Sequence, residues 1–236
     1  MTTPKPACEI CPTRESGVFC DVPKDEMREF SRNRSFNTYR RKSIIFYEGN
    51  PPLGLFCIQK GKVKISKHGM DGQVQIVRLA GPGDILGYRA LFSGEPYAAT
   101  AEVLEDASLC FVDKTATYAL LRKNAALALS ILERVCRDLR VSEDAVLDLV
   151  QRPVAERVAN MLLSLQETYG ASGPEGVRLN IALTREEMAE MVGTTAETLI
   201  RTLSDFKARG LVALEPPHAI IIKKAAELAR MAPERN

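Results

Sequence analysis

The chain has 236 residues, of which 45% are hydrophobic and 26% are charged, an ordinary balance for a folded globular protein. It contains no apolar run of about eighteen residues, and its start, MTTPKPAC, lacks the apolar core of a secretion signal, so we expect no membrane span, no signal peptide and a cytoplasmic location. The formal net charge of +2 is too small to indicate or exclude a nucleic-acid partner.

A cysteine-bearing segment, residues 1–24, precedes the first predicted domain. Cys8 and Cys11 form a Cys-x2-Cys pair, and Cys20 follows after eight further residues. Thiols stay unpaired in a reducing compartment, so clustered cysteines there indicate metal binding or redox chemistry rather than structural disulfides. Two other cysteines, Cys57 in an apolar run and Cys136 in a helical pattern, are expected to be small buried side chains with no ligand role.

Residues 25–118 are predicted to form an all-β domain. Polar and apolar residues alternate at 62–67 and 73–76, and glycine-containing turns recur at intervals of about ten residues. Short, evenly spaced strands of this kind are typical of a sandwich, jelly roll or barrel.

A long helix is predicted over residues 119–150. Apolar residues recur there at alternating steps of four and three, interrupted by one serine: Leu121, Ala125, Ala128, Leu132, Val135, Leu139, Ser142, Val146 and Leu149. Spacing of 3.5 residues over four heptads favours a coiled coil between two copies of the chain, with contacts at Leu132, Val135, Leu139, Val146 and Leu149. The alternative is a helix that packs only against its own β-domain.

Residues 151–236 are predicted to form a small, mostly helical domain. Its first helix follows Pro153, a loop is expected at 170–176, a short strand at 177–183 and two further strands within 211–224. Two capping boxes are predicted, Thr184 with Glu187 and Thr194 with Glu197, and Gly193 lies between them. This arrangement predicts a helix-turn-helix followed by a β wing.

The second helix of this motif is expected to enter the major groove of DNA. Its buried side is predicted to carry Leu199, Leu203 and Phe206, and its outer side Thr195, Ala196, Glu197, Ile200, Arg201 and Ser204. Arginine can donate two hydrogen bonds to guanine and glutamate can accept one from cytosine, so Glu197 and Arg201 have the chemistry to read bases. An ordinary ion pair between them is the alternative. Candidates for phosphate contacts are Lys207, Arg209, Lys223 and Lys224.

The order of these elements resembles that of the CRP/FNR family of bacterial transcription regulators. The motifs are IFYEGNPPLGLFCIQKGKVKI, GPGDILGYRALF and GTTAETLIRTLSDFKARGLV, and the similarity runs from about residue 25 to 225. The resemblance implies an α+β fold: an N-terminal cyclic-nucleotide-binding-like β jelly roll, a dimerisation helix and a C-terminal winged helix-turn-helix. It further implies a homodimer that binds palindromic double-stranded DNA and contacts RNA polymerase. The sequence shows no Ser/His/Asp or Cys/His constellation, so we expect no enzyme activity, the alternative being an enzyme or scaffold with an incidental helix-turn-helix.

The resemblance also bears on the signal that is sensed. Family members that bind cyclic AMP carry a glutamate and an Arg-Ser pair where this chain has Gly87-Tyr88-Arg89 and Tyr97-Ala98-Ala99-Thr100, so cyclic-nucleotide binding is not expected. Oxygen-sensing members hold a [4Fe-4S] cluster on three N-terminal cysteines and one in the β-domain. The matching residues are Cys8, Cys11, Cys20 and Cys110.

The resemblance therefore implies an oxygen- or redox-responsive cluster whose intact form favours the DNA-binding dimer. Zinc on the same cysteines, a metal-free thiol switch and a small-molecule effector in the β-domain are the alternatives.

Overall fold

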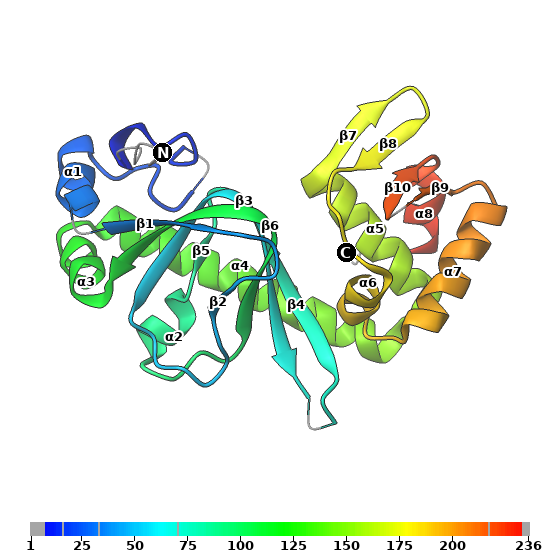
Figure 1. Ribbon diagram of the computed structural model, residues 1–236, viewed down its shortest axis with the longest axis horizontal. Helices are drawn as coiled ribbons and strands as arrows, with labels where there is room; N and C mark the ends of the chain where they lie inside the picture. The colour runs from blue at the N-terminus through cyan, green and yellow to red at the C-terminus, as the bar shows by residue number, and fades with distance from the viewer. Residues whose placement is uncertain (1–7, 16, 33, 70, 217, 233–236) are drawn as a thin grey trace. The chain divides into compact units, whose positions relative to one another are not determined.

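The computed structural model describes residues 8–15, 17–32, 34–69, 71–216 and 218–232 (Figure 1). The chain divides into two compact units, Met1–Val141 and Ser142–Asn236. Within the described ranges, none of the helices has both the length and the apolar character that crossing a bilayer requires.

Unit 1 is built on an antiparallel sheet preceded by a short N-terminal segment. The segment contains a 3-10 turn, η1 (Cys8–Ile10), and helix α1 (Lys24–Arg32). The strands and an inserted helix are β1 (Arg34–Tyr39), β2 (Ile44–Phe46), β3 (Gly54–His68), β4 (Val74–Ala80), β5 (Ile85–Leu86), α2 (Tyr88–Ser93) and β6 (Thr100–Asp113). The strand order is β1-β6-β3-β4, with β2 on β6 and β5 on β3. The predicted β-domain is confirmed, with α2 as an addition.

The long strands β3 and β6 pair along most of their length and carry the core of the β-domain. Val63 and Val103 lie opposite each other and are fully buried. The register shifts around Gly61, which has a φ of +89°, and a Cβ there would lie 2.6 Å from the Cα of Ala107. Only glycine fits this close approach, which lets the two strands bend while they stay paired.

Two helices follow the sheet, α3 (Lys114–Lys123) and α4 (Ala125–Gln151), where a single helix was predicted over 119–150. That prediction is wrong at its start, because Asn124 has an extended backbone with φ −127° and ψ 98°. The Asn124 side chain accepts a hydrogen bond from the Leu127 amide at 2.9 Å and donates one to Glu26 of α1 at 2.9 Å. Asn124 therefore ends α3 and caps the beginning of α4.

The described part of unit 2 contains the end of α4, four further helices and a small sheet. The helices are α5 (Val154–Tyr169), α6 (Arg185–Val192), α7 (Ala196–Ala208) and α8 (Ala225–Met231). The strands are β7 (Gly170–Gly173), β8 (Gly176–Leu179), β9 (Val212–Glu215) and β10 (Ala219–Ile222), in the order β7-β8-β10-β9. The predicted pair of strands within 211–224 is confirmed, whereas the predicted loop at 170–176 is a β-hairpin.

Candidate DNA-binding and cysteine sites

Helices α6 and α7 form the predicted helix-turn-helix. Thr184 accepts a hydrogen bond from the Glu187 amide at 3.1 Å, and the Glu187 carboxylate accepts one from the Thr184 amide at 2.9 Å, so the first capping box is confirmed. Gly193 ends α6 in the left-handed conformation, with φ 70°. The second predicted capping box is wrong: Thr195, not Thr194, caps α7 by accepting from the Thr198 amide, and Glu197 takes no part in the cap.

The two sides of α7 differ sharply in exposure. Leu199, Leu203 and Phe206 are at most 1% exposed and hold the helix against unit 2. Of the six residues predicted to face DNA, Ala196 is partly buried and the others are exposed: Thr195, Glu197, Ile200, Arg201 and Ser204. Among the described residues, no ion pair joins Glu197 to Arg201, so both charged groups are available to a ligand.

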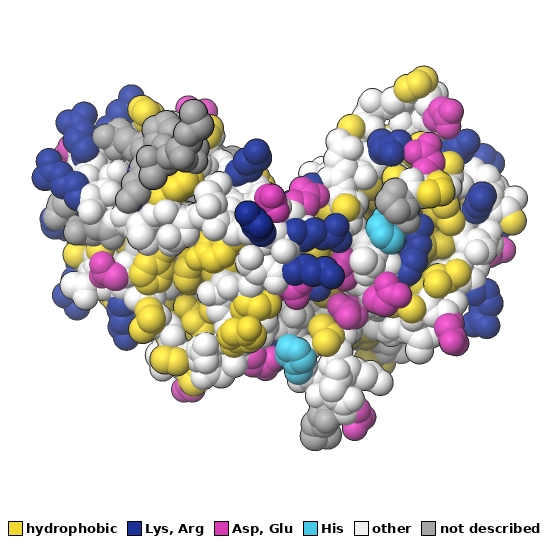
Figure 2. Space-filling model, viewed as in Figure 1, with side chains coloured by type: hydrophobic (Ala, Val, Ile, Leu, Met, Phe, Trp, Pro, Cys, Tyr) yellow, Lys and Arg dark blue, Asp and Glu magenta, His cyan; other side chains and the backbone are white. Residues whose placement is uncertain are grey.

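The four residues predicted to contact phosphates differ in whether they form ion pairs within the chain. Arg209 pairs with Asp205 at 3.3 Å, Lys223 with Glu175 at 4.0 Å and Lys224 with Glu227 at 3.0 Å. Lys207 is exposed on the last turn of α7. Figure 2 shows the resulting mixture of basic and acidic side chains over unit 2. Exposed pairs of this kind are weak and can exchange their partners for phosphate.

Arg157, on α5, holds the turn of the helix-turn-helix. Its guanidinium donates to the carbonyl oxygens of Val192 and Gly193, at 3.0 and 3.1 Å, and to those of Leu149 and Arg152, at 3.3 and 3.0 Å. One side chain thus joins the end of α4 to the turn that precedes α7. The sequence gives no sign of this role, because an arginine inside an amphipathic helix carries no distinctive pattern.

Helix α4 has an inner and an outer side. Leu127 and Ile131 are buried in unit 1, and Val135 packs partly against the same cluster. Leu132, Leu139 and Val146 are 56%, 58% and 59% exposed. Leu149 is also exposed. The apolar stripe predicted for dimer contacts therefore lies mostly on the outer side, while Val135 lies at its border with the domain.

An ionic network fixes the middle of α4 to the β-domain. The Asp138 carboxylate accepts hydrogen bonds from the Tyr88 hydroxyl, from Arg78 at 3.2 Å and from Arg134 at 3.0 Å. Arg134 also pairs with Asp84 at 2.6 Å. Burial disfavours the charged form of Asp138, but the Tyr88 hydrogen bond and the two arginines outweigh it, and the pKa of this carboxyl is lowered.

Cys8 and Cys110, two of the four predicted metal ligands, are buried and are linked by hydrogen bonds. The Cys8 amide donates to the Ser31 hydroxyl at 3.3 Å, and Arg34 donates both to that hydroxyl, at 3.2 Å, and to the Cys110 sulfur, at 3.1 Å. Burial raises the pKa of the Cys8 thiol to about 11 and also raises that of Cys110, while the Arg34 charge lowers both.

The other two predicted ligands lie in a series of turns. Cys11 is partly buried, and its thiol lies 3.3 Å from the Thr13 hydroxyl. Cys20 is exposed, and its thiol donates to the Asp21 carboxylate at 3.3 Å. Arg14 closes the loop between them by donating to the carbonyl oxygens of Cys20 and Val22. Among the described residues, no three His, Cys, Asp or Glu side chains lie close enough to hold a single metal ion.

The remaining cysteines differ from what the sequence predicted. Cys136 is exposed on α4, so its predicted burial is wrong; it lies on the solvent side of the helix. Cys57 is partly buried, as an apolar run suggests, but it pairs directly with Cys110 across strands β3 and β6. Sequence spacing gave no sign of this neighbour, because strand register brings the two residues together.

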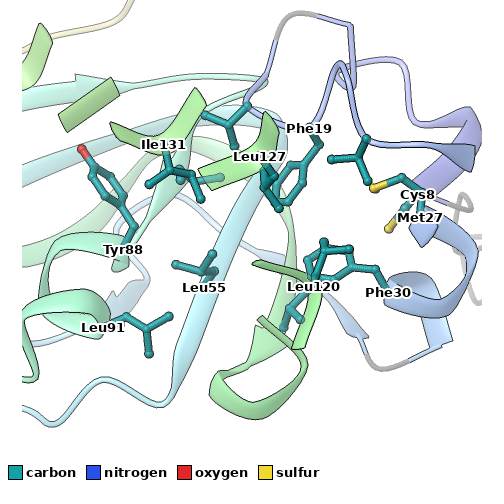
Figure 3. Close-up of a cluster of buried hydrophobic side chains, with 14 residues drawn as sticks. Cys8, Phe19, Met27, Phe30, Leu55, Tyr88, Leu91, Leu120, Leu127 and Ile131 are labelled. Carbon is teal, nitrogen blue, oxygen red and sulfur yellow. The ribbon is translucent and has the colours of Figure 1, made fainter. Parts of the chain in front are cut away.

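The N-terminal segment shares a buried cluster with the helices. Cys8, Val18, Phe19, Val22, Met27 and Phe30 pack in one cluster with Leu55, Leu120, Leu127 and Ile131. Figure 3 shows Phe19 facing Leu127 of α4, with Cys8 and Met27 at the outer side of the cluster. The segment that carries three cysteines is therefore packed against the beginning of α4.

The β-domain also contains a cavity of about 340 Å³. Its lining combines aromatic and charged side chains, among them Arg78, Tyr88, Arg89, Glu95 and Tyr97. The volume is within the range of about 300–1,000 Å³ that small-molecule sites occupy. Arg78 and Tyr88 also belong to the ionic network of Asp138, so this cavity is connected to α4.

Comparisons with known proteins agree with this architecture. The sequence profile of the cyclic nucleotide-binding domain matches residues 36–124, and that of the Crp-like helix-turn-helix domain matches residues 156–231. The CRP-like cAMP-activated global transcriptional regulator of Mycobacterium tuberculosis is 29% identical over 217 residues, 92% of this chain and 96% of that protein. The anaerobic regulatory protein of Bacillus subtilis is 28% identical over 185 residues, 78% of each chain.

A solved structure, that of FixK2 from Bradyrhizobium japonicum, has the same fold. It is 24% identical with a TM-score of 0.77, and the similarity covers 86% of this chain and 99% of that one. These comparisons confirm the predicted fold class, with an N-terminal β-domain, a long helix and a C-terminal helix-turn-helix.

Proposed function

The chain belongs to the CRP/FNR family of DNA-binding transcription regulators, and from this membership we propose that a [4Fe-4S] cluster held by its cysteines controls its binding to DNA. Regulators of this family bind DNA and act as dimers, and they are not enzymes. Such a regulator needs a surface that reads DNA, a surface that forms the dimer and a group that receives the signal.

We assign DNA reading to the outer side of α7 and dimerisation to the exposed stripe of α4. Glu197 and Arg201 are exposed and unpaired with each other, so each can meet a base edge without first breaking an ion pair. A two-fold dimer presents two α7 helices, which suits palindromic double-stranded DNA with half-sites about one helical turn apart. On such an operator the dimer would contact RNA polymerase.

The observation that carries the signal assignment is the shared packing of the cysteine segment and α4. Cys8 belongs to the buried cluster that includes Leu127 and Ile131, so a change in the Cys8 segment alters the packing of the helix. The bonds from Cys8 through Ser31 and Arg34 to Cys110 tie the same segment to strand β6. When bound, a cluster would supply iron–thiolate bonds that join these parts and that oxidants break.

The side chains around these thiols suit a cysteine-bound cluster. Thiolates are soft ligands that select iron–sulfur clusters or zinc. Arg34 places a positive charge beside the Cys110 sulfur, to which it donates a hydrogen bond at 3.1 Å. The same ligand type also suits zinc, so the metal content of the protein decides between the two.

The test is the metal content of protein purified without oxygen. We expect about four iron and four sulfide per monomer and absorbance near 400 nm that is lost in air. Cys8→Ser, Cys11→Ser and Cys110→Ser should each lose the iron, while Cys136→Ser, on the exposed side of α4, should keep it. Zinc in place of iron would refute the cluster, and retention of iron in all three variants would refute the assigned ligands.

A small-molecule effector is the second candidate signal. It is favoured by the 340 Å³ cavity, whose Arg78 and Tyr88 also bind Asp138 of α4. The Mycobacterium tuberculosis relative is described as cAMP-activated. A protein that contains neither iron nor zinc, but whose DNA binding depends on an added ligand, would support this candidate.

A further inference from the structure

We propose that Cys57 is a ligand of the cluster and occupies the fourth position, which the sequence resemblance assigns to Cys20. The inference rests on the proposed function, since it concerns which thiolates hold the same cluster. Cys8, Cys11 and Cys110 keep their assigned roles.

The register of the sheet puts Cys57 beside Cys110. The two residues are direct partners in the antiparallel pair formed by β3 and β6, between Phe56–Phe111 and Ile58–Leu109. Directly opposite residues project to the same face of a sheet, with Cβ atoms about 4.5–5.5 Å apart. The two thiols are therefore neighbours on the same face of the sheet.

Cys57 also borders the buried cluster to which the N-terminal segment contributes. It packs against the buried cluster that contains Cys8, Val18 and Phe19. Burial is the main reason why the pKa of the Cys57 thiol is raised well above its ordinary value, and the neighbouring thiols of Cys110, Cys8 and Cys11 add to the shift. Cys57 thus lies within electrostatic range of all three other proposed ligands.

The surroundings of Cys20 suit a ligand less well. Its thiol is exposed and donates to the Asp21 carboxylate. The Cys20 thiol must give up this carboxylate before it can bind iron. Cys57, by contrast, lies directly opposite Cys110, whose sulfur accepts a hydrogen bond from Arg34 at 3.1 Å.

Two double variants with four cysteines each separate the ligand sets. Cys20→Ser with Cys136→Ser leaves Cys8, Cys11, Cys57 and Cys110, whereas Cys57→Ser with Cys136→Ser leaves Cys8, Cys11, Cys20 and Cys110. After purification without oxygen, we expect the first protein to retain about four iron and four sulfide per monomer. The second should contain at least about tenfold less iron and lack the absorbance near 400 nm.

Iron content, sulfide content and visible absorbance are measured on both variants and on the wild type. Far-ultraviolet circular dichroism is the control for folding. If the Cys57→Ser protein does not match the wild-type dichroism, Cys57→Ala replaces it, since alanine adds no buried hydroxyl. The inference is overturned if the variant lacking Cys57 keeps its iron or if the variant lacking Cys20 loses it. Wild-type protein without iron would instead refute the proposed function, so the two failures are distinct.

Discussion

Glu197 and Arg201 are exposed on α7, and their side chains have the chemistry to distinguish base pairs. Replacing either by alanine should weaken binding to the preferred operator by about 1–3 kcal/mol, or roughly 5- to 150-fold, because a base contact is lost. Binding to unrelated DNA should change little, since phosphate contacts dominate there. Fluorescence anisotropy with specific and unrelated duplexes at one fixed salt concentration measures both.

Lys207→Ala is the matched control for these two variants. It should weaken binding to all sequences alike and reduce the slope of log affinity against log salt by about one. If Glu197→Ala and Arg201→Ala both retained the wild-type preference for the operator, α7 would not be the reading helix.

Sequence patterns predicted single residues well where the pattern is local. The Thr184 and Glu187 capping box and the buried Leu199, Leu203 and Phe206 follow directly from spacing. The α7 cap was misplaced because Thr194 and Thr195 both suit the position, and only the backbone decides between them. The pairing of Cys57 with Cys110 depends on strand register over more than fifty residues, which short patterns do not encode.

At the scale of elements, a contact between residues far apart in sequence also explains why the predicted long helix is interrupted at Asn124, before α4. Leu121 fits the heptad stripe as well as the later residues do, so the pattern predicts one helix. Asn124 overrides it, because its side chain caps α4 and binds Glu26 of α1, a residue far away in sequence. The hairpin of β7 and β8 was missed because its glycine-rich sequence is typical of a loop.

The ionic network that holds α4 should make unit 1 sensitive to acid. The pKa of Asp138 in the folded state lies below its ordinary value of 3.8, so its carboxylate stabilises the folded state fully above about pH 4. This contribution is lost as the pH falls through the folded-state pKa. Asp138→Asn should lower the free energy of unfolding at pH 7 by about 2 kcal/mol and weaken its dependence on pH in the acid range.

Urea unfolding between pH 2 and 8 measures this effect. Asp71→Asn, which changes an exposed carboxylate in the turn between β3 and β4, is the control and should leave the curve close to that of the wild type. Equal pH dependence in the wild type and Asp138→Asn would show that the network does not stabilise the fold.

At the scale of the whole molecule, we expect the exposed stripe of α4 to determine the oligomeric state. Leu139→Glu places a charge at a position that we assign to the dimer seam, so the variant should be monomeric where the wild type is dimeric. Its affinity for a palindromic operator should fall by at least tenfold, because each monomer then binds a single half-site. Light scattering after size-exclusion chromatography gives the mass of each species.

Arg137→Glu is the control for this change, since Arg137 is exposed on α4 outside the stripe. It should leave the dimer intact. A Leu139→Glu protein that stays dimeric and correctly folded would rule out the stripe as the interface.

The order of the domains can be predicted because the spacing of apolar residues changes along the chain, from every second residue in the strands to about every 3.5 residues in the long helix. The boundary between the two units lies after Val141, inside α4, whereas the sequence predicts a boundary near residue 150. The spacing of apolar residues in α4 shows which residues lie on the same side of the helix. It does not show at which residue the helix stops packing against unit 1 and becomes part of unit 2.

The buried cluster shared by the cysteine segment and α4 restricts how this sequence can change during evolution. Phe19, Val22 and Phe30 fill the core of unit 1, whatever the cysteines bind. A lineage that abandoned the signal would lose only the selection on its thiols, while the need for these large side chains would continue. We therefore expect related proteins in which serine or alanine replaces the cysteines, while Phe19, Val22 and Phe30 keep large apolar side chains.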